Sequence, residues 1–318
     1  MRIPDFFIAG APKCGTTALF SYLQTHPGIF LPEAQPWVGP VAAKEPHYFC
    51  TDFPSYRRCR ALDDYLRLFA PAPPGALIGE ASVWYLYSEV AVPHIIERNP
   101  HARFIVLLRD PVDMAHSLHN QLYHTLDEDI EDFRHAWDMQ ARRARGQDIP
   151  RNCREPKHLL YKRVCSFSHQ LERLFEHVPR EQCLVIIADE FGAAPERTYR
   201  RALEFLGLPP DNRDSFTRVN ASATSRSRLL AVALRTFPQR MERFYRTSKA
   251  IANAVGLHPG STLSRWNRKE QVRAPLDAAF RRQLVAEFAP DVDRLERLLD
   301  RRLDLWRESP NLSLSHVP

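Results

Sequence analysis

The chain has 318 residues, of which 44% are hydrophobic and 26% are charged, so it is long enough to bury a sizeable core in one or two domains. Its formal net charge of +6 favours anionic ligands but is modest over this length, and no nucleic-acid-binding motif accompanies it. No stretch approaches the roughly 18 apolar residues of a membrane span. We therefore expect neither a nucleic-acid-binding nor a membrane-spanning protein.

The cysteines indicate a reducing compartment. The sequence contains no C-x-x-C pair and no zinc-like spacing of cysteine and histidine. The N-terminus also lacks a charged stretch followed by a long apolar one. We expect free thiols in a cytoplasmic protein, whereas in a secreted protein Cys50 with Cys59, or Cys153 with Cys165, would be the candidate disulfides. The six cysteines are Cys14, Cys50, Cys59, Cys153, Cys165 and Cys183.

The first loop has the residues of an anion-binding site. The apolar run at 5–9 predicts a buried strand, residues 16–24 predict a helix, and the loop between them reads GAPKCG. Glycine-bearing turns and helix N-termini direct backbone N–H groups and partial positive charge at one point. Lys13 adds a full charge, and Thr16 and Thr17 add hydroxyl groups. The loop therefore suits a phosphate-like group.

The position of the lysine distinguishes between kinds of anion chemistry. A nucleotide-triphosphate P-loop reads G-x-x-x-x-G-K-[ST], but here the lysine precedes the second glycine. The loop resembles instead the P-K-[SC]-G-T-T loop of sulfotransferases that use 3′-phosphoadenosine-5′-phosphosulfate (PAPS). A turn whose glycines serve only the backbone is the alternative. The resemblance implies that the 5′-phosphosulfate contacts Lys13, Cys14, Gly15, Thr16, Thr17 and Ala18.

A second motif follows a short strand predicted at 29–31. Residues 32–43 form a proline-rich loop that contains Trp37, either a substrate lid or a plain connector, and the segment 44–49 reads KEPHYF. This segment resembles the K-E-x-[HY]-[FY]-F segment of heparan-sulfate-type and related bacterial sulfotransferases. The resemblance implies that Glu45 takes the proton of the acceptor hydroxyl and that His47 lines the acceptor site. A solvated Lys44–Glu45 pair beside a packed histidine is the alternative.

The segment GEASVWYL at 79–86 forms a third motif, at the end of a strand predicted at 76–80. It resembles the family's G-E-[KA]-S-P-x-Y segment, in which some glycan sulfotransferases have lysine at the position of Ala81. Lys44 is the nearest candidate to replace that cation. The expected contacts with the acceptor are Lys44, His47, Trp37 and Trp84.

The clearest buried strand is predicted at 103–108 and ends in Arg109-Asp110-Pro111 before a helix at 112–123. Open α/β sheets bind ligands outside the carboxyl ends of their strands, where an arginine can hold a phosphate with two hydrogen bonds. By itself this tripeptide is also a common structural device. The pattern R-[DN]-P followed by serine resembles the family's 3′-phosphate motif. It implies that Arg109 and Ser117 hold the 3′-phosphate of PAPS.

The remaining elements follow from hydrophobic periodicity and helix-ending signals. An arginine-rich loop at about 211–236 lies where the family has a loop over the cofactor. Arg226 and Arg228 are candidate phosphate contacts there, and a disordered basic loop is the alternative. The other predicted elements are helices at 88–98, 127–145, 159–177, 195–206 and 276–305, the last interrupted at Pro290, and a strand at 183–187.

Strands that alternate with helices predict an α/β fold with a parallel sheet flanked by helices and a modified P-loop. We expect one domain over 1–318, with the cofactor motifs in 5–120 and a C-terminal helical segment at about 275–306. The resemblance implies a bacterial P-loop nucleoside triphosphate hydrolase-like sulfotransferase, which moves a sulfonate group from PAPS to an acceptor hydroxyl and releases PAP. Its catalytic residues would be Glu45, Lys13 and His47, and no metal is expected.

Two other functions compete with this one. A P-loop kinase or NTPase needs a lysine after Gly15, which the sequence lacks. A catalytically inactive module that binds anionic glycans would not need Glu45 as a base. The acceptor is left open among metabolites, lipids, glycans and protein tyrosine, and so is the oligomeric state.

Overall fold

The computed structural model of the chain describes residues 2–33, 44–211, 213, 215–216, 223–225, 268–270 and 275–307. The chain divides into two compact units. The first unit comprises residues 1–118, 160–219 and 276–318, and the second comprises residues 119–159 and 220–275. All the motifs of the first 118 residues therefore belong to one unit.

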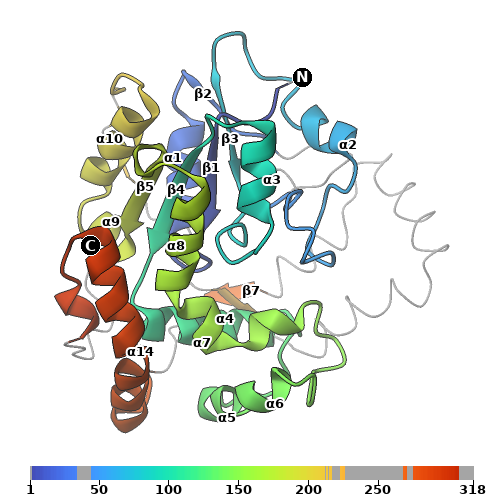
Figure 1. Ribbon diagram of the computed structural model, residues 1–318, viewed down its shortest axis with the longest axis vertical. Coiled ribbons are helices and arrows are strands. Elements are labelled where there is room, and N and C mark those ends of the chain that lie inside the picture. The colour runs from blue at the N-terminus through green and yellow to red at the C-terminus, as the bar shows by residue number, and fades with distance from the viewer. Residues whose placement is uncertain are drawn as a thin grey trace, which may run out of the picture. The chain divides into compact units, whose positions relative to one another are not determined.

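The core of the first unit is a sheet of five parallel strands in the order β2, β3, β1, β4, β5 (Figure 1). Its central strands β1 and β4 are almost wholly buried, as expected of a parallel sheet covered on both faces. The predicted α/β fold with a parallel sheet is confirmed. The strands are β1 (Phe6–Gly10), β2 (Ile29–Phe30), β3 (Leu77–Ala81), β4 (Arg103–Leu108) and β5 (Cys183–Ile187).

The helices of the first unit cover both faces of this sheet (Figure 1). α1 connects β1 to β2 in one direction along the sheet, and α3 connects β3 to β4 in the opposite direction. Because both crossovers are right-handed, these two helices lie on opposite faces of the sheet. The helices are α1 (Thr16–Gln24), α2 (Leu62–Arg67), α3 (Ala91–Arg98), α4 (Pro111–His124, which continues into the second unit), α7 (Tyr161–Cys165), α8 (Phe167–His177), α9 (Ala188–Ala193), α10 (Pro195–Leu206) and α14 (Ala278–Leu299).

The strand order creates a switch point between β1 and β4. The chain leaves the carboxyl end of β1 toward β2, and it leaves the carboxyl end of β4 toward β5 on the other side. Loops that part in opposite directions open a crevice at that edge, where α/β sheets bind their ligands. The residues that follow these two strands are those of the GAPKCG loop and Arg109.

Two glycines allow the strands of this edge to approach closely. A Cβ on Gly79 of β3 would lie 2.2 Å from Cζ of Phe6 and 2.7 Å from Cδ2 of Leu31. A Cβ on Gly10, the last residue of β1, would lie 2.9 Å from Cβ of Leu86. The segment after β3 therefore packs directly on the end of β1.

Helix α14 corrects one prediction. The closing helix was expected to be interrupted at Pro290, but α14 runs continuously from Ala278 to Leu299. Proline removes one backbone hydrogen bond, and the loss is offset here by packing against α8, which Phe288 and Val292 support from the buried face of α14. Asp291 also accepts hydrogen bonds from the backbone N–H groups of Phe167 (2.8 Å) and Ser168 (3.2 Å), so it caps the start of α8.

Three other predicted helices are shorter than expected. The helix expected at 88–98 begins at Ala91, because the hydroxyl of Ser88 accepts from the N–H of Ala91 (3.0 Å) and caps it. The helix expected at 159–177 is divided at Ser166 into α7 and α8.

The second unit contains the third shortened helix. Instead of one helix over 127–145 it has α5 (Phe133–Asp138) and α6 (Gln140–Arg143), because Glu128 accepts from the N–H groups of Asp129 and Ile130 and holds a non-helical turn. Glu128 also forms a fully buried ion pair with Arg143. An antiparallel pair of β6 (Ala223–Ser225) and β7 (Arg268–Glu270) belongs to this unit.

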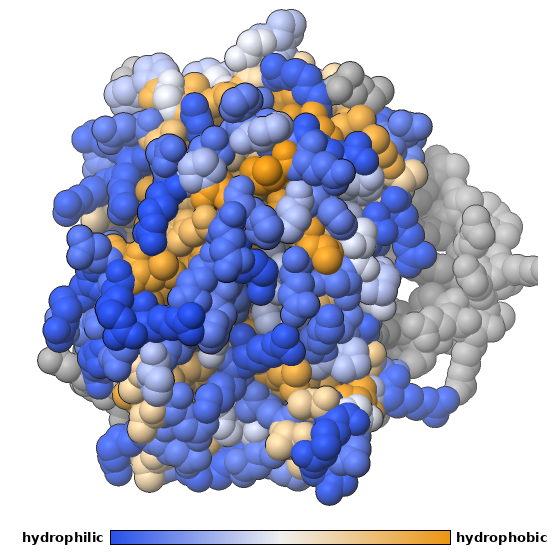
Figure 2. All heavy atoms as spheres, in the orientation of Figure 1, coloured by the Kyte–Doolittle hydropathy of each residue, from blue (hydrophilic) through white to orange (hydrophobic). Residues whose placement is uncertain are grey.

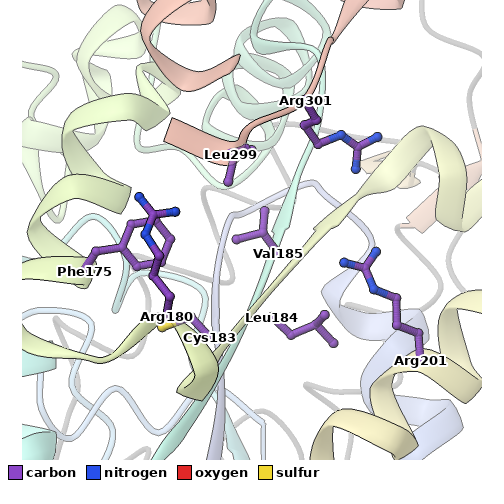
Figure 3. Close-up of a pocket in the computed structure, with 8 residues that line it drawn as sticks. All are labelled: Phe175, Arg180, Cys183, Leu184, Val185, Arg201, Leu299 and Arg301. Atoms are coloured by element: carbon purple, nitrogen blue, oxygen red, sulfur yellow. The ribbon is translucent and has the colours of Figure 1, made fainter. Parts of the chain in front are cut away.

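Arginines surround a pocket at the outer strand of the sheet. The pocket measures about 180 Å³, and Arg180, Arg201 and Arg301 lie around the apolar side chains of β5 in it (Figure 3). Arg180 stacks on Phe175 at 4.4 Å, and Arg301 pairs with Glu190. Charges at an exposed edge oppose pairing with a strand of another chain.

The surface is mostly polar on the face that Figure 2 shows. Among the described residues, Leu305 is the large hydrophobic residue that stays strongly exposed, at 70%. No helix in the described ranges combines the length and the apolar composition that a membrane crossing requires. All six cysteines are free, as predicted.

Candidate active site

The GAPKCG loop presents an uncapped helix N-terminus at the switch point. Lys13 (φ 65°) and Gly15 (φ 90°) both adopt left-handed conformations, which turn the chain sharply into α1. No side chain in the described part of the chain caps this helix. Among the described residues, the backbone N–H groups of 14–17 donate to no backbone carbonyl. Such N–H groups and the helix dipole attract an anion.

The side chain of Cys14 is buried against the loop and α4. It is fully buried, and its Sγ lies 3.4 Å from the carbonyl of Pro12 and 3.7 Å from Sδ of Met114. Burial raises the pKa of the Cys14 thiol to about 12, so the thiol stays neutral. Cys14 therefore joins the loop to α4, and its predicted contact with the cofactor can come only from its backbone.

Arg109 follows β4 at the same edge. Its guanidinium lies 3.4 Å from Asp113 on α4, and 17% of its side chain is exposed. It is also close enough to the loop to lower the pKa of the Cys14 thiol, as Lys13 does. Ser117 lies further along α4 and is buried. The two predicted cofactor motifs thus meet at neighbouring strand ends, although their roles stay predictions.

Arg281 of α14 is a residue that the sequence did not single out. It pairs with Asp110 at 2.8 Å and with Asp113 at 2.6 Å. Burial and the neighbouring Asp113 raise the pKa of Asp110 to about 6, although Arg281 opposes the shift. Arg281 thereby holds the carboxylate of Asp113, which also contacts Arg109. It lies more than 160 positions from Asp113, and no local pattern marks it.

Glu45 lies at the centre of a small polar cluster. Its carboxylate contacts Nζ of Lys44, Nε2 of His47 (3.2 Å) and the backbone N–H of Val83 (2.9 Å). Burial by itself would raise the pKa of Glu45, but the Lys44 ammonium and His47 outweigh it and lower the pKa to about 2. Glu45 is therefore ionised at neutral pH.

His47 supports this cluster from the buried side. The residue is 3% exposed, its ring meets the rings of Tyr56 (6.1 Å) and Tyr85 (6.3 Å) edge-on, and its Nε2 faces Glu45. Its Nδ1 is buried and finds no hydrogen-bond partner among the described residues. Glu45 is the more accessible of the two, with 22% of its side chain exposed. The geometry therefore favours Glu45 over His47 as the group that meets an acceptor.

The other predicted contacts fall into three groups. Thr16 is buried at the start of α1, and Thr17 and Ala18 are half-buried beside it. Trp84 is 3% exposed and packs against Tyr56 and Tyr87, so its ring belongs to the core in this structure. The candidates that lie outside the described residues are Trp37, Arg226 and Arg228.

Glu80 of β3 is a second buried carboxyl group that the sequence did not assign. It is fully buried, and its Oε2 accepts hydrogen bonds from the hydroxyls of Tyr65 (2.9 Å) and Tyr85 (2.7 Å). Its Oε1 finds no partner among the described residues. Burial raises the pKa of Glu80 to about 7 although the neighbouring hydroxyls lower it. Glu80 and Tyr85 both lie in the GEASVWYL segment, but Tyr65 comes from α2, and the family resemblance assigned no role to Glu80.

Glutamine at position 80 should change how stability depends on pH. The pKa of Glu80 in the folded protein is about 7, above its ordinary value of 4.5, so ionising Glu80 lowers the free energy of unfolding. This loss of stability grows as the pH rises from about 4.5 to 7 and is complete above pH 7. At 1.36 kcal/mol per unit the cost reaches about 3 kcal/mol. Urea unfolding should therefore give Glu80→Gln a free energy of unfolding that, relative to wild type, is about 3 kcal/mol higher at pH 8 than at pH 4.5. Parallel stability curves for the two proteins would contradict the assignment.

The chain's family follows from comparison with known proteins. An uncapped helix N-terminus and an ionised carboxylate lie at one edge of a parallel sheet, an arrangement that suits transfer of a group from an anionic donor. Residues 4–212 match the family model described as Sulfotransferase family. The chain therefore belongs to the sulfotransferase family.

Individual relatives agree with that assignment. The chain is 27% identical over 218 residues to the bifunctional heparan sulfate N-deacetylase/N-sulfotransferase 2 of Bos taurus, a match that covers 66% of this chain and 22% of that protein. It is 30% identical over 157 residues to carbohydrate sulfotransferase 15 of Homo sapiens, covering 36% of this chain and 26% of that protein. The chain therefore matches about a quarter of the length of these curated relatives.

A solved structure supports the fold along the whole chain. The crystal structure of a sulfotransferase from Alicyclobacillus acidocaldarius matches with a TM-score of 0.67 and 27% identity, and the match covers 97% of this chain and 100% of that one. The chain thus has the sulfotransferase fold, which is of the P-loop nucleoside triphosphate hydrolase-like kind.

Proposed function

We propose that this protein transfers a sulfonate group from PAPS to an acceptor hydroxyl and releases PAP. The observation that carries the proposal is the uncapped N-terminus of α1 with Lys13, which lies beside Arg109 at the switch point and at the same sheet edge as ionised Glu45. Two cationic positions at neighbouring strand ends fit a donor that carries anionic groups at both its 5′ and 3′ ends. Membership of the sulfotransferase family supports the same reaction.

Each residue has a stated part in this proposal. Lys13, the N–H groups of 14–17 and the hydroxyls of Thr16 and Thr17 hold the 5′-phosphosulfate. Arg109 and Ser117 hold the 3′-phosphate. The fit rests on N–H donors that are bonded to no described backbone carbonyl and on Arg109, whose side chain is 17% exposed. PAPS when bound supplies the sulfonate and its phosphate leaving group.

Glu45 acts on the acceptor. It takes the hydroxyl proton as the acceptor oxygen bonds to sulfur and the bond from sulfur to the phosphate oxygen breaks. Lys44 holds Glu45 in the free protein. The anionic donor competes with Glu45 for the Lys44 ammonium. Loss of the Lys44 contact raises the basicity of Glu45 when both substrates are present.

Activity is expected to persist in EDTA. The lysine-bearing loop and the helix N-terminus supply the positive charge that Mg²⁺ supplies to kinases. PAP formation from PAPS should be measured with and without chelator, and the two rates should agree. Complete loss in EDTA with recovery on adding Mg²⁺ would favour the kinase or NTPase function.

The acceptor and the setting belong to the proposal as well. We propose a bacterial, cytoplasmic enzyme that acts on a hydroxyl of a metabolite, lipid or glycan and binds no nucleic acid. The full-length likeness to a bacterial sulfotransferase and six free thiols support this setting. A screen of hydroxyl compounds with ³⁵S-labelled PAPS tests it and should label at least one class. Tight PAP binding with no labelled product would favour the inactive anion-binding module.

A further inference from the structure

The segment that carries Glu45 has an unusual backbone. Glu45 has φ 69° and His47 has φ 49°, so two of three successive residues adopt the left-handed conformation that favours glycine, and Pro46 lies between them. Residues with a side chain keep this conformation only where their surroundings enforce it. The surroundings of residues 44–50 therefore decide where the Glu45 carboxylate lies.

Three alternate amides of the segment are held by the last residue of β3 and by residues that follow it. The N–H of Glu45 donates to the carbonyl of Ala81 (2.8 Å), and the N–H of His47 donates to the hydroxyl of Ser82 (3.0 Å). The N–H of Phe49 donates to the hydroxyl of Tyr85 (3.4 Å). Only the first acceptor is backbone. The other two are side-chain oxygens, so the position of the segment depends on two particular residues.

Glu80 determines how the Tyr85 hydroxyl is used. A phenol hydroxyl has one proton, and here it donates to Oε2 of Glu80 at 2.7 Å. The oxygen of Tyr85 is thereby left to accept from Phe49. Glu80 and Tyr85 are both fully buried, so water does not compete for these groups. The same stretch of chain also contacts the side chain of Glu45 directly, because the N–H of Val83 donates to its carboxylate (2.9 Å).

We propose that Ser82 and Tyr85 are positioning residues for the base of the reaction, with Glu80 orienting Tyr85. They hold the backbone of 45–49 in its left-handed path and so aim the Glu45 carboxylate at the acceptor. This inference rests on the proposed function for the role of Glu45. It gives the buried polar residues of the GEASVWYL segment a task that is separate from binding of the donor.

The test uses Ser82→Ala and Tyr85→Phe in the full chain, with Ser168→Ala as a matched control. Ser168 is also a buried serine, and its hydroxyl bonds to Asp291 on α14, outside the proposed site. Amide hydrogen exchange is measured over 44–50 by mass spectrometry. PAP affinity is measured by calorimetry, and kcat and KM are measured from PAP formed from PAPS with the acceptor that the screen identifies.

We expect faster exchange over 44–50 in Ser82→Ala and Tyr85→Phe and no change in Ser168→Ala. In the first two variants kcat should fall about tenfold to a hundredfold, less than loss of the base itself, while PAP affinity stays within about twofold. A merely structural role would lower thermal stability in all three variants without separating kcat from PAP affinity.

Two outcomes overturn the inference. Unchanged exchange over 44–50 in both variants means that the two hydroxyls do not hold the segment. Faster exchange with a wild-type kcat means that the position of the segment does not matter to the base. Should wild type form no PAP from PAPS with any acceptor, the proposed sulfonate transfer fails, and the role of Ser82 and Tyr85 as positioning residues for the base fails with it. Exchange would then decide only whether they hold the segment.

Discussion

Glu45→Gln is expected to lower kcat about 10²–10⁴-fold, the usual contribution of a general base. Glutamine keeps the size of the side chain and can still accept from the N–H of Val83, but it takes no proton at neutral pH. The affinity for PAP should stay within a few-fold of wild type, because Glu45 lies in the segment 44–49, whereas the proposed PAP contacts lie in the GAPKCG loop and at Arg109. Steady-state kinetics and calorimetry measure the two quantities separately.

His47→Ala serves as the comparison for that variant. Because His47 is buried and contacts Glu45 through Nε2, its loss should lower kcat less than Glu45→Gln does. Near-full turnover in Glu45→Gln together with abolished turnover in His47→Ala would reverse the roles of the two residues. Full turnover in both variants would place the base elsewhere and make the segment structural.

Arg109→Ala is expected to weaken PAP binding about tenfold to a hundredfold, since a hydrogen bond to a charged group contributes about 1.5–3 kcal/mol. The affinity for adenosine 5′-phosphate should hardly change, because that nucleotide lacks the 3′-phosphate. Arg201→Ala is a matched control that removes the same charge at the exposed outer edge of the sheet. Calorimetry with both nucleotides measures each affinity.

The contrast between the two nucleotides decides the result. Equal weakening of PAP and adenosine 5′-phosphate in Arg109→Ala would mean that Arg109 acts on the shared part of the ligand. A similar loss of PAP affinity in Arg201→Ala would mean that only the overall charge matters.

The sheet was largely predictable from local sequence. Residues 104–108 and 183–187 form continuous apolar runs, and the strands predicted at 103–108 and 183–187 have those bounds because buried parallel strands need no alternation. The helix predicted from Thr16 also begins there, since the glycine before it turns the chain. These elements position the candidate site, which explains why the motifs could be placed on their strand ends.

The helices show where local patterns fail. Proline at 290 signals a break, yet contacts between α14 and α8 sustain the helix across it. Over 127–145 the charged sequence suits a helix, but Glu128 bonds to the following backbone N–H groups and to Arg143 instead. Both outcomes depend on residues that are remote in sequence or on side-chain competition, which a periodicity does not record.

The residues of the candidate site also differ in whether they could be predicted from sequence. Lys13, Arg109 and Glu45 lie in short motifs and could be located from the resemblance of those motifs to the sulfotransferase family. Arg281, which holds Asp110 and Asp113, could not, nor could the pairing of Glu80 with Tyr65. Such partners are brought together only by the fold, so the contacts that aim and tune the motif residues need the structure.

Nucleotide binding to the wild-type protein in EDTA tests the central claim most directly, because it needs no knowledge of the acceptor. Calorimetry should show that PAP binds at least about tenfold more tightly than adenosine 5′-phosphate without any metal, since Arg109 and Ser117 meet the 3′-phosphate. ATP with Mg²⁺, measured alongside, should bind more weakly than PAP. Equal affinities for PAP and adenosine 5′-phosphate, or a preference for ATP with Mg²⁺, would contradict the account.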